Sequence, residues 1–336
     1  MSIKIAINGY GRIGRGLHRK ILDEGIEGVE VVAINSRSQA DSHAYLLKHD
    51  TLHGACKADI QVDGQNLKVN GKTVYVYQIK DPEDIDWAQH DIDVVIESTG
   101  RFTSREDAEK HIHSGAKRVI ITAPCKDPSI HNIVMGVNNK NCDTDECAVV
   151  SNASCTTNCL APVLSVLEKE FGIDQALVTT LHAFTYTQNL LDNSNPEDFR
   201  RARAATQSII PTTTGAMKAI SRVIPSLDGK VDGMAFRLPV PNVSCIDLTV
   251  RLGKDVDAET INKAFKKYEA GDLKGVLGTC DEPLVSSDFN HDTRSAIVDT
   301  LSTKVMDNGF AQVIAWYDNE WGYISRIIDL IRWFHP

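Results

Sequence analysis

The sequence predicts an α/β protein that combines a doubly wound parallel sheet with a second, mixed and mainly antiparallel sheet. Three observations lead to this prediction. A short apolar strand pattern at the N-terminus runs through a glycine-rich turn into an amphipathic helix pattern. Strand and helix patterns then alternate over the first 150 residues. After residue 176, strand patterns dominate, and Ala258 to Tyr268 is the long helix pattern among them.

The N-terminal segment carries a phosphate-binding turn in its expected setting. Ile3 to Asn8 is an apolar strand pattern, and Gly9, Gly11 and Gly14 follow it at the start of a helix pattern. Glycines at this spacing let the backbone turn tightly and approach a pyrophosphate, which then binds at the helix N-terminus. The segment therefore predicts a dinucleotide-binding domain of the Rossmann type.

The end of the second strand pattern bears on which dinucleotide is bound. Val29 to Asn35 leads into Ser36 and Arg37, and no carboxylate follows before Asp41. A carboxylate at this strand end binds the ribose hydroxyls of NAD, whereas Ser36 can donate a hydrogen bond to a 2'-phosphate and Arg37 can pair with its charge. The pattern suits NADP at least as well as NAD. The alternative is that Ser36 and Arg37 are ordinary solvent-facing loop residues.

The rest of the first domain continues the alternation with one insertion. Residues 57 to 79 read as antiparallel ribbons that turn at Asp63-Gly64 and Asn70-Gly71. Strand patterns resume at Asp93 to Ile96 and Arg118 to Thr122, with a helix pattern at Glu106 to His113 between them. An open parallel sheet binds its ligand at the carboxyl ends of such strands.

Ser151 to Pro162 is the stretch most indicative of chemistry. A short strand pattern, Cys147 to Val150, precedes it, and a helix pattern follows it, so that Cys155 lies at the turn from strand to helix. The unpaired amide groups and the dipole of a helix start favour a thiolate. We therefore expect a lowered pKa for Cys155 and a nucleophilic role. The alternative is a small buried thiol with no chemical role, which suits Cys159 better.

The other cysteines predict neither a disulfide scaffold nor a metal site. The chain has eight cysteines in 336 residues and no Cys-x-x-Cys pair. Cys142, Cys147, Cys155 and Cys159 do not have the spacing of a structural zinc site, and the last two fall at a helix start. We expect no metal.

Downstream segments supply a candidate base and two anion sites. The strand pattern Ala176 to Leu181 delivers His182, which is either the general base for Cys155 or a structural histidine. Thr212 to Lys218 starts a helix whose hydroxyls and amides can bind an anion. Arg237 can bind phosphate through two parallel hydrogen bonds of its guanidinium, a bidentate contact. Two anion sites near one thiol suggest a phosphorylated substrate and a second phosphate.

Composition and organisation limit the class of protein. The formal net charge of −9 argues against nucleic acid as the main partner, and no apolar run is long enough to span a membrane. The Met1 end shows no signal-peptide pattern, so we expect a cytoplasmic protein. The predicted domains are 1–152 for the dinucleotide, 153–318 for catalysis, and a helix over 319–336 that packs back on the first domain.

Five motifs make the chain resemble phosphorylating glyceraldehyde-3-phosphate dehydrogenases. They are Ile7 to Gly14, Ser151 to Pro162, His182 to Gln188, Pro211 to Lys218 and Tyr317 to Tyr323. The resemblance runs from Lys4 to nearly the C-terminus. It implies an NAD(P)-dependent oxidation of D-glyceraldehyde 3-phosphate to 1,3-bisphosphoglycerate, with inorganic phosphate as the second substrate. It also implies a homotetramer in which the loop from Leu190 to Pro211 approaches a neighbouring subunit's cofactor site.

The resemblance implies roles for individual residues. Cys155 would be the nucleophile and His182 its base. The substrate phosphate and the attacking phosphate would be bound by Ser154, Thr156, Thr185, Thr214, Gly215 and Arg237. The dinucleotide would be contacted by Arg12, Ile13, Thr122 and Asn319, with Asn319 near the nicotinamide amide. Lys80 stands where many members have an arginine on the adenine side.

One departure from the family pattern concerns the cofactor. Most NAD-using members carry aspartate where this chain has Ser36, whereas members that accept NADP resemble this chain there and often have serine where Ser194 lies. NADP, or both cofactors, is therefore expected. The alternative activities are those of erythrose-4-phosphate dehydrogenase, a sibling with the same thiol chemistry, and of a binding protein that senses redox state through Cys155 without catalysis.

Overall fold

The computed structural model describes residues 2–144, 147–196 and 198–335. The chain forms two compact units: residues 1–133, 141–153 and 324–336 make the first, and residues 134–140 and 154–323 make the second. The predicted fold class is confirmed, because the first unit holds a mostly parallel sheet and the second a mixed, mainly antiparallel one. The domain limits derived from the sequence remain predictions.

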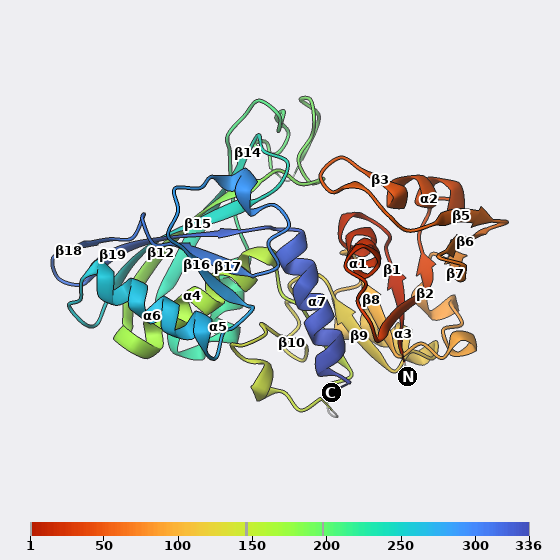
Figure 1. The fold of residues 1–336 in the computed structure, drawn as a ribbon, viewed down its shortest axis with the longest axis horizontal. Helices are drawn as coiled ribbons and strands as arrows, with labels where there is room; N and C mark the ends of the chain where they lie inside the picture. The colour runs from red at the N-terminus through yellow and green to blue at the C-terminus, as the bar shows by residue number, and fades with distance from the viewer. Residues whose placement is uncertain (1, 145–146, 197, 336) are drawn as a thin grey trace. The chain divides into compact units, whose positions relative to one another are not determined.

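The first unit is built on a nine-stranded sheet with the strand order β10-β11-β9-β8-β1-β2-β7-β6-β5 (Figure 1). The strands are parallel from β10 to β7, and β5 and β6 extend the edge as an antiparallel ribbon. Its elements are β1 (Ile3–Asn8), α1 (Arg12–Asp23), β2 (Val29–Asn35), α2 (Ala40–Lys48), β3 (His49–Asp50), β4 (Gly54–Ala55), β5 (Ile60–Asp63), β6 (Asn66–Val69), β7 (Lys72–Tyr77), β8 (Val94–Glu97), α3 (Arg105–His113), β9 (Arg118–Ile121), β10 (His131–Asn132) and β11 (Val149–Ser151).

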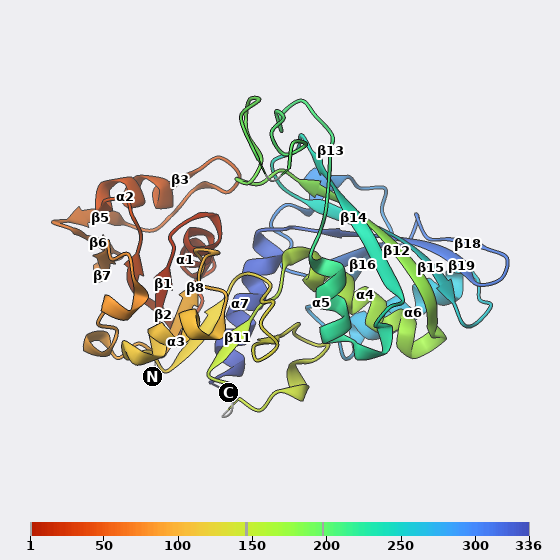
Figure 2. The same ribbon diagram turned by 180° about the vertical axis from the view of Figure 1, so that it is seen from behind.

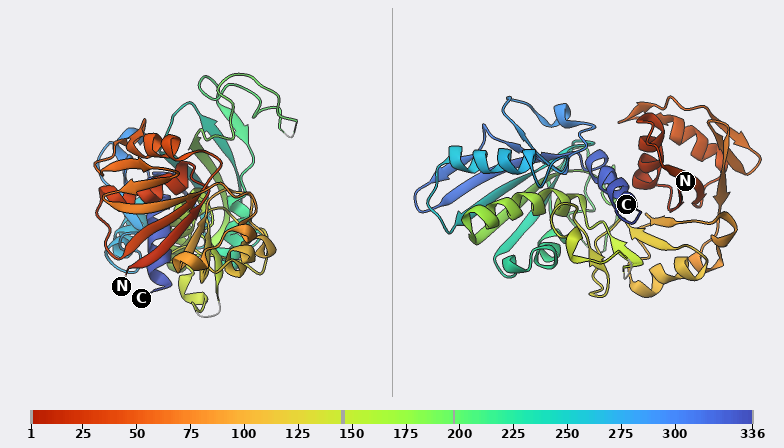
Figure 3. Two further views of the ribbon diagram at one scale, coloured as in Figure 1. Left: turned by 90° about the vertical axis from the view of Figure 1, so that its right-hand side faces the viewer. Right: turned by 60° about the horizontal axis from the view of Figure 1, so that its bottom comes forward.

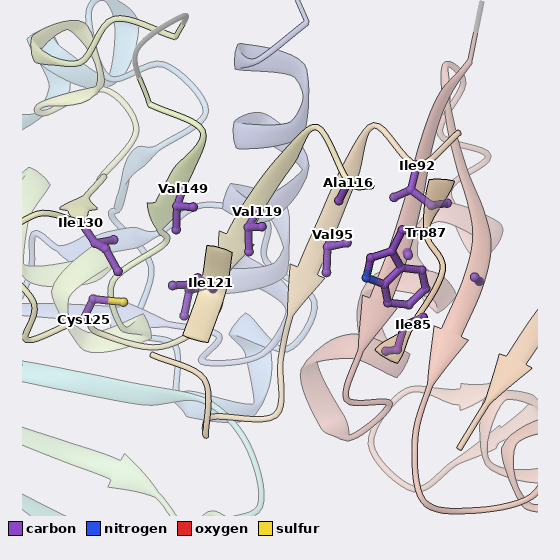
Figure 4. Packing of buried hydrophobic residues seen from close by; sticks show 13 residues of the cluster. Ile85, Trp87, Ile92, Val95, Ala116, Val119, Ile121, Cys125, Ile130 and Val149 are labelled. Carbon is purple, nitrogen blue, oxygen red and sulfur yellow. The ribbon is translucent and has the colours of Figure 1, made fainter. Parts of the chain in front are cut away.

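The predicted ribbon turns are present, since Gly64 and Gly71 adopt positive φ between paired strands. The short helix α2 was not predicted, because its hydrophobic face is weak: three of its nine residues are buried. Apolar side chains from β8, β9 and β11 belong to one buried cluster with Trp87 and Ile85, which runs through the core of this unit (Figure 4). A fully buried core of this size keeps the carboxyl ends of the parallel strands in a fixed arrangement.

The second unit is an eight-stranded sheet with helices α4, α5 and α6 against it (Figures 2 and 3). Most neighbouring strands are antiparallel, but β12 and β14 are parallel, as are β16 and β17. Its elements are α4 (Cys155–Phe171), β12 (Ile173–Ala183), β13 (Ile210–Thr212), α5 (Ala216–Val223), β14 (Val231–Leu238), β15 (Ser244–Leu252), α6 (Ala258–Ala270), β16 (Leu277–Cys280), β17 (Ala296–Asp299), β18 (Lys304–Met306) and β19 (Phe310–Tyr317), followed by α7 (Trp321–Trp333), whose residues from Ile324 onward belong to the first unit.

Within the described residues, no helix is both long enough and apolar enough to cross a membrane.

The last part of α7 is apolar on the face that meets α1. A Cβ atom added to Gly16 of α1 would lie 2.6 Å from Ile324 Cδ1, so a larger residue at this position would require the Ile324 side chain to shift.

A buried histidine makes stability in the first unit dependent on pH. His18 of α1 is 2% exposed, and its Nδ1 lies within hydrogen-bond distance of the Tyr10 hydroxyl, at 2.6 Å. Burial lowers the pKa of His18 to about 3 from 6.5. The unfolded chain therefore binds a proton between these values that the folded chain does not, and the free energy of unfolding falls as the pH falls through this window.

We expect the His18 effect to amount to about 2 kcal/mol between pH 7.5 and pH 5. The urea midpoints of the parent and of His18→Gln, measured at both pH values, test this. The variant should lose less stability on acidification than the parent does. Equal losses in the two proteins would contradict the assignment to His18.

Candidate active site

Cys155 is the first residue of α4, as the sequence predicts. The N-cap is Ser154, whose Oγ accepts the backbone N–H of Thr157 at 3.0 Å. Ala153 before it has a φ of 50°, a left-handed conformation that turns the chain sharply from β11 into α4. Helix α4 continues from Cys155 through Pro162 to Phe171.

The predicted base lies beside the thiol. His182, near the end of β12, is 4% exposed, and its Nε2 lies 3.4 Å from Cys155 Sγ. The parallel register of β12 with β14 pairs His182 with Arg237, so strand pairing alone brings the guanidinium to the imidazole. Cys155, His182 and Arg237 thus form one cluster in the second unit.

The imidazole has two competing partners on its far side. Its Nδ1 lies 2.7 Å from the Ala183 carbonyl and 2.6 Å from Arg237 Nη1. Nδ1 can donate to the carbonyl or accept from the guanidinium, but it cannot do both. When Nδ1 donates to Ala183, the lone pair of Nε2 faces the sulfur and can accept its proton. An anion that engages Arg237 favours this tautomer, because it withdraws the competing donor.

The expectation of a lowered pKa for Cys155 is wrong. Burial raises the pKa of the thiol, and the Arg237 charge and the hydrogen bonds of the helix start offset this only in part. Burial together with the Arg237 charge lowers the pKa of His182 to about 3. The pair is therefore a neutral thiol beside a neutral imidazole, and the sulfur becomes a nucleophile only as His182 takes its proton.

Arg237 has the features of an anion-binding residue. Its side-chain Nε is buried and has no hydrogen-bond partner among the described residues. A buried unpaired donor on a cation is costly unless a ligand satisfies it. Residues on the neighbouring strands complete the setting: Ile210 of β13 pairs with Arg237 in register, and Thr214 and Gly215 follow β13 at the start of α5. Gly215 offers no side-chain cap, and the backbone N–H of Ala216 donates to Thr214 Oγ1 at 3.2 Å. The dipole of α5 favours an anion at this helix start.

The remaining predicted substrate residues are engaged within the protein. Ser154 uses its hydroxyl to cap α4, and Thr156 Oγ1 lies 3.0 Å from the Tyr317 hydroxyl. Thr185 follows the end of β12, where its hydroxyl lies 2.9 Å from that of Thr187.

Sequence reasoning assigned no role to Tyr317, Thr180 and Ser244, which hold this site together. Tyr317 is buried, lies edge-on to the His182 ring, and joins Thr156 to Thr180 through its hydroxyl at 3.0 and 2.9 Å. Ser244 donates to Asn319 Oδ1 at 2.8 Å and so sets the orientation of that side-chain amide. Tyr317 belongs to the motif from Tyr317 to Tyr323, but its partners Thr156 and Thr180 lie on other elements, so the motif does not reveal the contacts.

The glycine-rich turn of the first unit fits a pyrophosphate. Gly9 has a φ of 95°, and a Cβ atom on Gly14 would lie 2.3 Å from Gly9 O, so both positions require glycine. A Cβ on Gly11 would meet nothing within 4 Å, which leaves open space at the start of α1. The first turn of α1, with Arg12 and Ile13, has no acidic residue and no side-chain cap. The dipole of α1 therefore favours an anion at this helix start.

A buried polar network supports this turn, and sequence reasoning did not find it. Trp87 Nε1 donates to His111 Nδ1 at 3.1 Å, so His111 carries its proton on Nε2 and donates it to Glu97 at 3.2 Å. The same carboxylate accepts the side-chain amide of Asn8 at 2.5 Å and the backbone N–H of Thr99 at 2.8 Å. The strand ends beside Gly9 are thereby held in place.

Of the other predicted cofactor residues, most lie at exposed or half-buried positions in their own units, and Asn319 is buried. Ser36 follows β2, where its N–H donates to the Tyr77 carbonyl at 3.0 Å, and its neighbour Arg37 is exposed. Lys80 is exposed after β7, and Thr122 is half-buried at the end of β9. In the second unit, Ser194 lies in an exposed loop, whereas Asn319 is 8% exposed.

Comparisons with known proteins cover almost the whole chain. Residues 3–105 match the model of the NAD binding domain of glyceraldehyde 3-phosphate dehydrogenase, and residues 154–319 match the model of its C-terminal domain. The chain is 51% identical to glyceraldehyde-3-phosphate dehydrogenase 2 of Bacillus subtilis over 99% of its own length and 96% of the relative's. It is 51% identical to the Geobacillus stearothermophilus enzyme, covering 98% and 97% of the two chains, and 47% identical to that of Podospora anserina, covering 99% and 98%. The chain therefore belongs to the glyceraldehyde-3-phosphate dehydrogenase family.

Proposed function

We propose that the chain oxidises D-glyceraldehyde 3-phosphate to 1,3-bisphosphoglycerate with NAD(P)⁺ and inorganic phosphate. The observation that carries the proposal is the cluster in which Cys155 Sγ lies 3.4 Å from His182 Nε2 while Arg237 contacts the other ring nitrogen. Whole-chain identity of about 50% to named members of the family supports the same activity.

The first step makes use of the neutral thiol and imidazole. His182 Nε2 takes the proton of Cys155 as the sulfur attacks the aldehyde carbon and the carbonyl oxygen becomes an oxyanion. His182 then returns this proton to the oxygen, which becomes the hydroxyl of a hemithioacetal. The amides at the start of α4 stabilise the developing oxyanion. The residues of the chain thus turn an aldehyde carbon into one that can lose a hydride.

Oxidation and phosphorolysis follow at the same sulfur. NAD(P)⁺, when bound, supplies the hydride acceptor, and the glycine-rich turn at Gly9, Gly11 and Gly14 would hold its pyrophosphate. His182 takes the hydroxyl proton as the carbon becomes a thioester. Inorganic phosphate then attacks this carbon, the carbon–sulfur bond breaks, and an acyl phosphate leaves. Arg237, Thr185, Thr214 and Gly215 would bind the two phosphate groups.

An assay with and without inorganic phosphate tests the proposed reaction. The purified protein should reduce NAD⁺ or NADP⁺ with glyceraldehyde 3-phosphate only when phosphate is present. Erythrose 4-phosphate, the substrate of the alternative activity, should give a lower kcat/KM. Turnover that does not require phosphate would reject the phosphorylating reaction, and absence of turnover with either aldehyde would favour a binding or sensing protein.

Arg237 should matter for both substrate binding and the state of His182. We expect Arg237→Leu to lower kcat/KM for glyceraldehyde 3-phosphate by about 10- to 100-fold, because a charged hydrogen bond contributes about 1.5–3 kcal/mol. Its loss should also raise the pKa of His182, since the Arg237 charge is one cause of the low value. The kinetics and an NMR titration of His182 measure the two effects. Arg251→Leu, an exposed change in the same unit, is the matched control and should leave both unchanged.

For the cofactor, we propose NADP or dual use, supported by Ser36 and Arg37 at the end of β2. Arg37 is exposed and forms no ion pair with another described residue, so its charge is available to a 2'-phosphate. Ser36→Asp should shift the ratio of kcat/KM values toward NAD by at least about tenfold, equal to 1.4 kcal/mol of repulsion. Ser226→Asp adds the same charge at an exposed site in the second unit and should not change the ratio. An unaltered ratio in Ser36→Asp would mean that Ser36 does not contact the ribose.

We also propose a homotetramer. The loop from Leu190 to Pro211 exposes apolar side chains, including Leu191 at 77% and Phe199 at 83%. Exposed apolar side chains that gather in one loop favour a protein–protein interface. Light scattering should give a tetramer, and Phe199→Asp should lower the mass; a monomeric parent would reject the assembly. The cytoplasmic location stays a prediction.

A further inference from the structure

Two cysteines and one histidine of the first unit lie close together. Cys142 and Cys147 are joined as a disulfide. One ring nitrogen of His131 and the two sulfur atoms all lie within 4.8 Å of one another. Neither the proposed reaction nor the glycine-rich turn uses these side chains. We call this cluster the His-Cys-Cys site.

The sheet and a short loop bring the three residues together. His131 opens β10, which pairs in parallel with β11 so that His131 faces Val150, three residues after Cys147. Hydrogen bonds hold the described residues on either side of this loop. Cys147 N donates to the Asp143 carbonyl at 3.1 Å, and the guanidinium of Arg118 on β9 donates to the Thr144 carbonyl. The convergence therefore follows from the fold.

The donor set is that of a thiophilic metal ion. Zinc binds cysteine thiolates and histidine nitrogens, and three protein ligands leave a fourth position for water. Two thiolates also balance the charge of a divalent ion. Cys142 and Cys147 are 9% and 7% exposed, whereas His131 is exposed. One side of the site is thus shielded and the other is open for the ion to enter.

We propose that the reduced His-Cys-Cys site binds a zinc-class divalent metal ion and that disulfide formation closes it. A dithiol reductant transfers two electrons and two protons to the disulfide, giving two thiols and the oxidised reductant. The metal ion then binds both sulfurs and the His131 nitrogen, and two protons leave. Oxidation by a small disulfide reverses the sequence and releases the ion. The proposal does not depend on the dehydrogenase reaction.

The test is a zinc titration of the full-length chain against a chromophoric chelator. The background is Cys155→Ser, so that the catalytic thiol does not bind the metal. Protein reduced with a phosphine should bind one equivalent of zinc that diamide-oxidised protein does not bind. Cys142→Ser should abolish that equivalent, and His131→Asn should weaken it by more than about tenfold, the minimum seen for outer-shell changes. Cobalt in place of zinc should give a thiolate-to-metal charge-transfer band in the reduced protein.

Two controls separate this result from a general loss of structure or of thiols. Cys280→Ser removes a partly exposed thiol of the second unit and should leave the zinc equivalent intact. In the Cys155-containing protein, His131→Asn should keep the parent's thermal midpoint and dehydrogenase activity. The proposal is overturned if reduced protein binds no more zinc than oxidised protein, or if Cys142→Ser or His131→Asn binds zinc as the parent does.

Discussion

Cys155→Ala is expected to abolish dehydrogenase activity, with a loss of about 10⁴-fold or more in kcat/KM, because no other side chain can carry the acyl group. The change should leave the fold intact. Cys155 is only partly buried at the start of α4, and the helix cap is made by the neighbouring Ser154. NAD(P)⁺ binding, measured by protein fluorescence, should persist, since the glycine-rich turn belongs to the first unit.

The control for this substitution is a thiol of comparable exposure elsewhere in the same unit. Cys280→Ala should keep full activity, because Cys280 lies at the end of β16 and its sulfur donates to the Glu282 carbonyl at 3.4 Å. Alkylation of the parent by iodoacetamide should remove activity in step with modification of Cys155, located by peptide mass. Normal turnover in Cys155→Ala would show that Cys155 is not the nucleophile.

His182→Asn is expected to lower kcat by about 10²- to 10⁴-fold, the usual contribution of a general base. The effect should be large here because burial raises the pKa of the Cys155 thiol, so that little thiolate exists without proton transfer to His182. The variant should recover activity as the pH rises, because hydroxide then removes the thiol proton. Measurement of kcat between pH 6 and pH 10 tests this.

A second readout distinguishes a base from a merely structural residue. The rate of Cys155 alkylation should fall in His182→Asn at neutral pH and approach the parent's rate at high pH. His111→Asn provides the comparison, since His111 is equally buried in the other unit and bonds to Glu97 rather than to a thiol. It should leave the pH dependence of alkylation unchanged. An unchanged alkylation profile in His182→Asn would contradict its role as base.

Local sequence patterns were sufficient for much of the fold. The strand, glycines and helix at the N-terminus, the two Gly turns of the ribbon, and the position of Cys155 at a helix start all depend on neighbours within a few residues. Each is present in the structure. The helix α2 was not predicted, because its few buried residues give the hydrophobic pattern no clear helical period.

The ionisation of the site could not be derived in this way. A helix start predicts a lowered thiol pKa, but the pKa of a group depends on all its surroundings, and burial outweighs the helix here. The network of Trp87, His111 and Glu97, the hydroxyl contacts of Tyr317, and the approach of His131 to Cys142 likewise join residues distant in sequence.

The sequence by itself determined the family motifs, the order of most elements and the candidates for the nucleophile and its base, because these depend on short runs of neighbouring residues. Only the tertiary structure decided which partners face the imidazole, which donors remain unsatisfied, and which way each pKa moves. Those properties arise from strand register and from exclusion of water, and both are set when distant segments pack together.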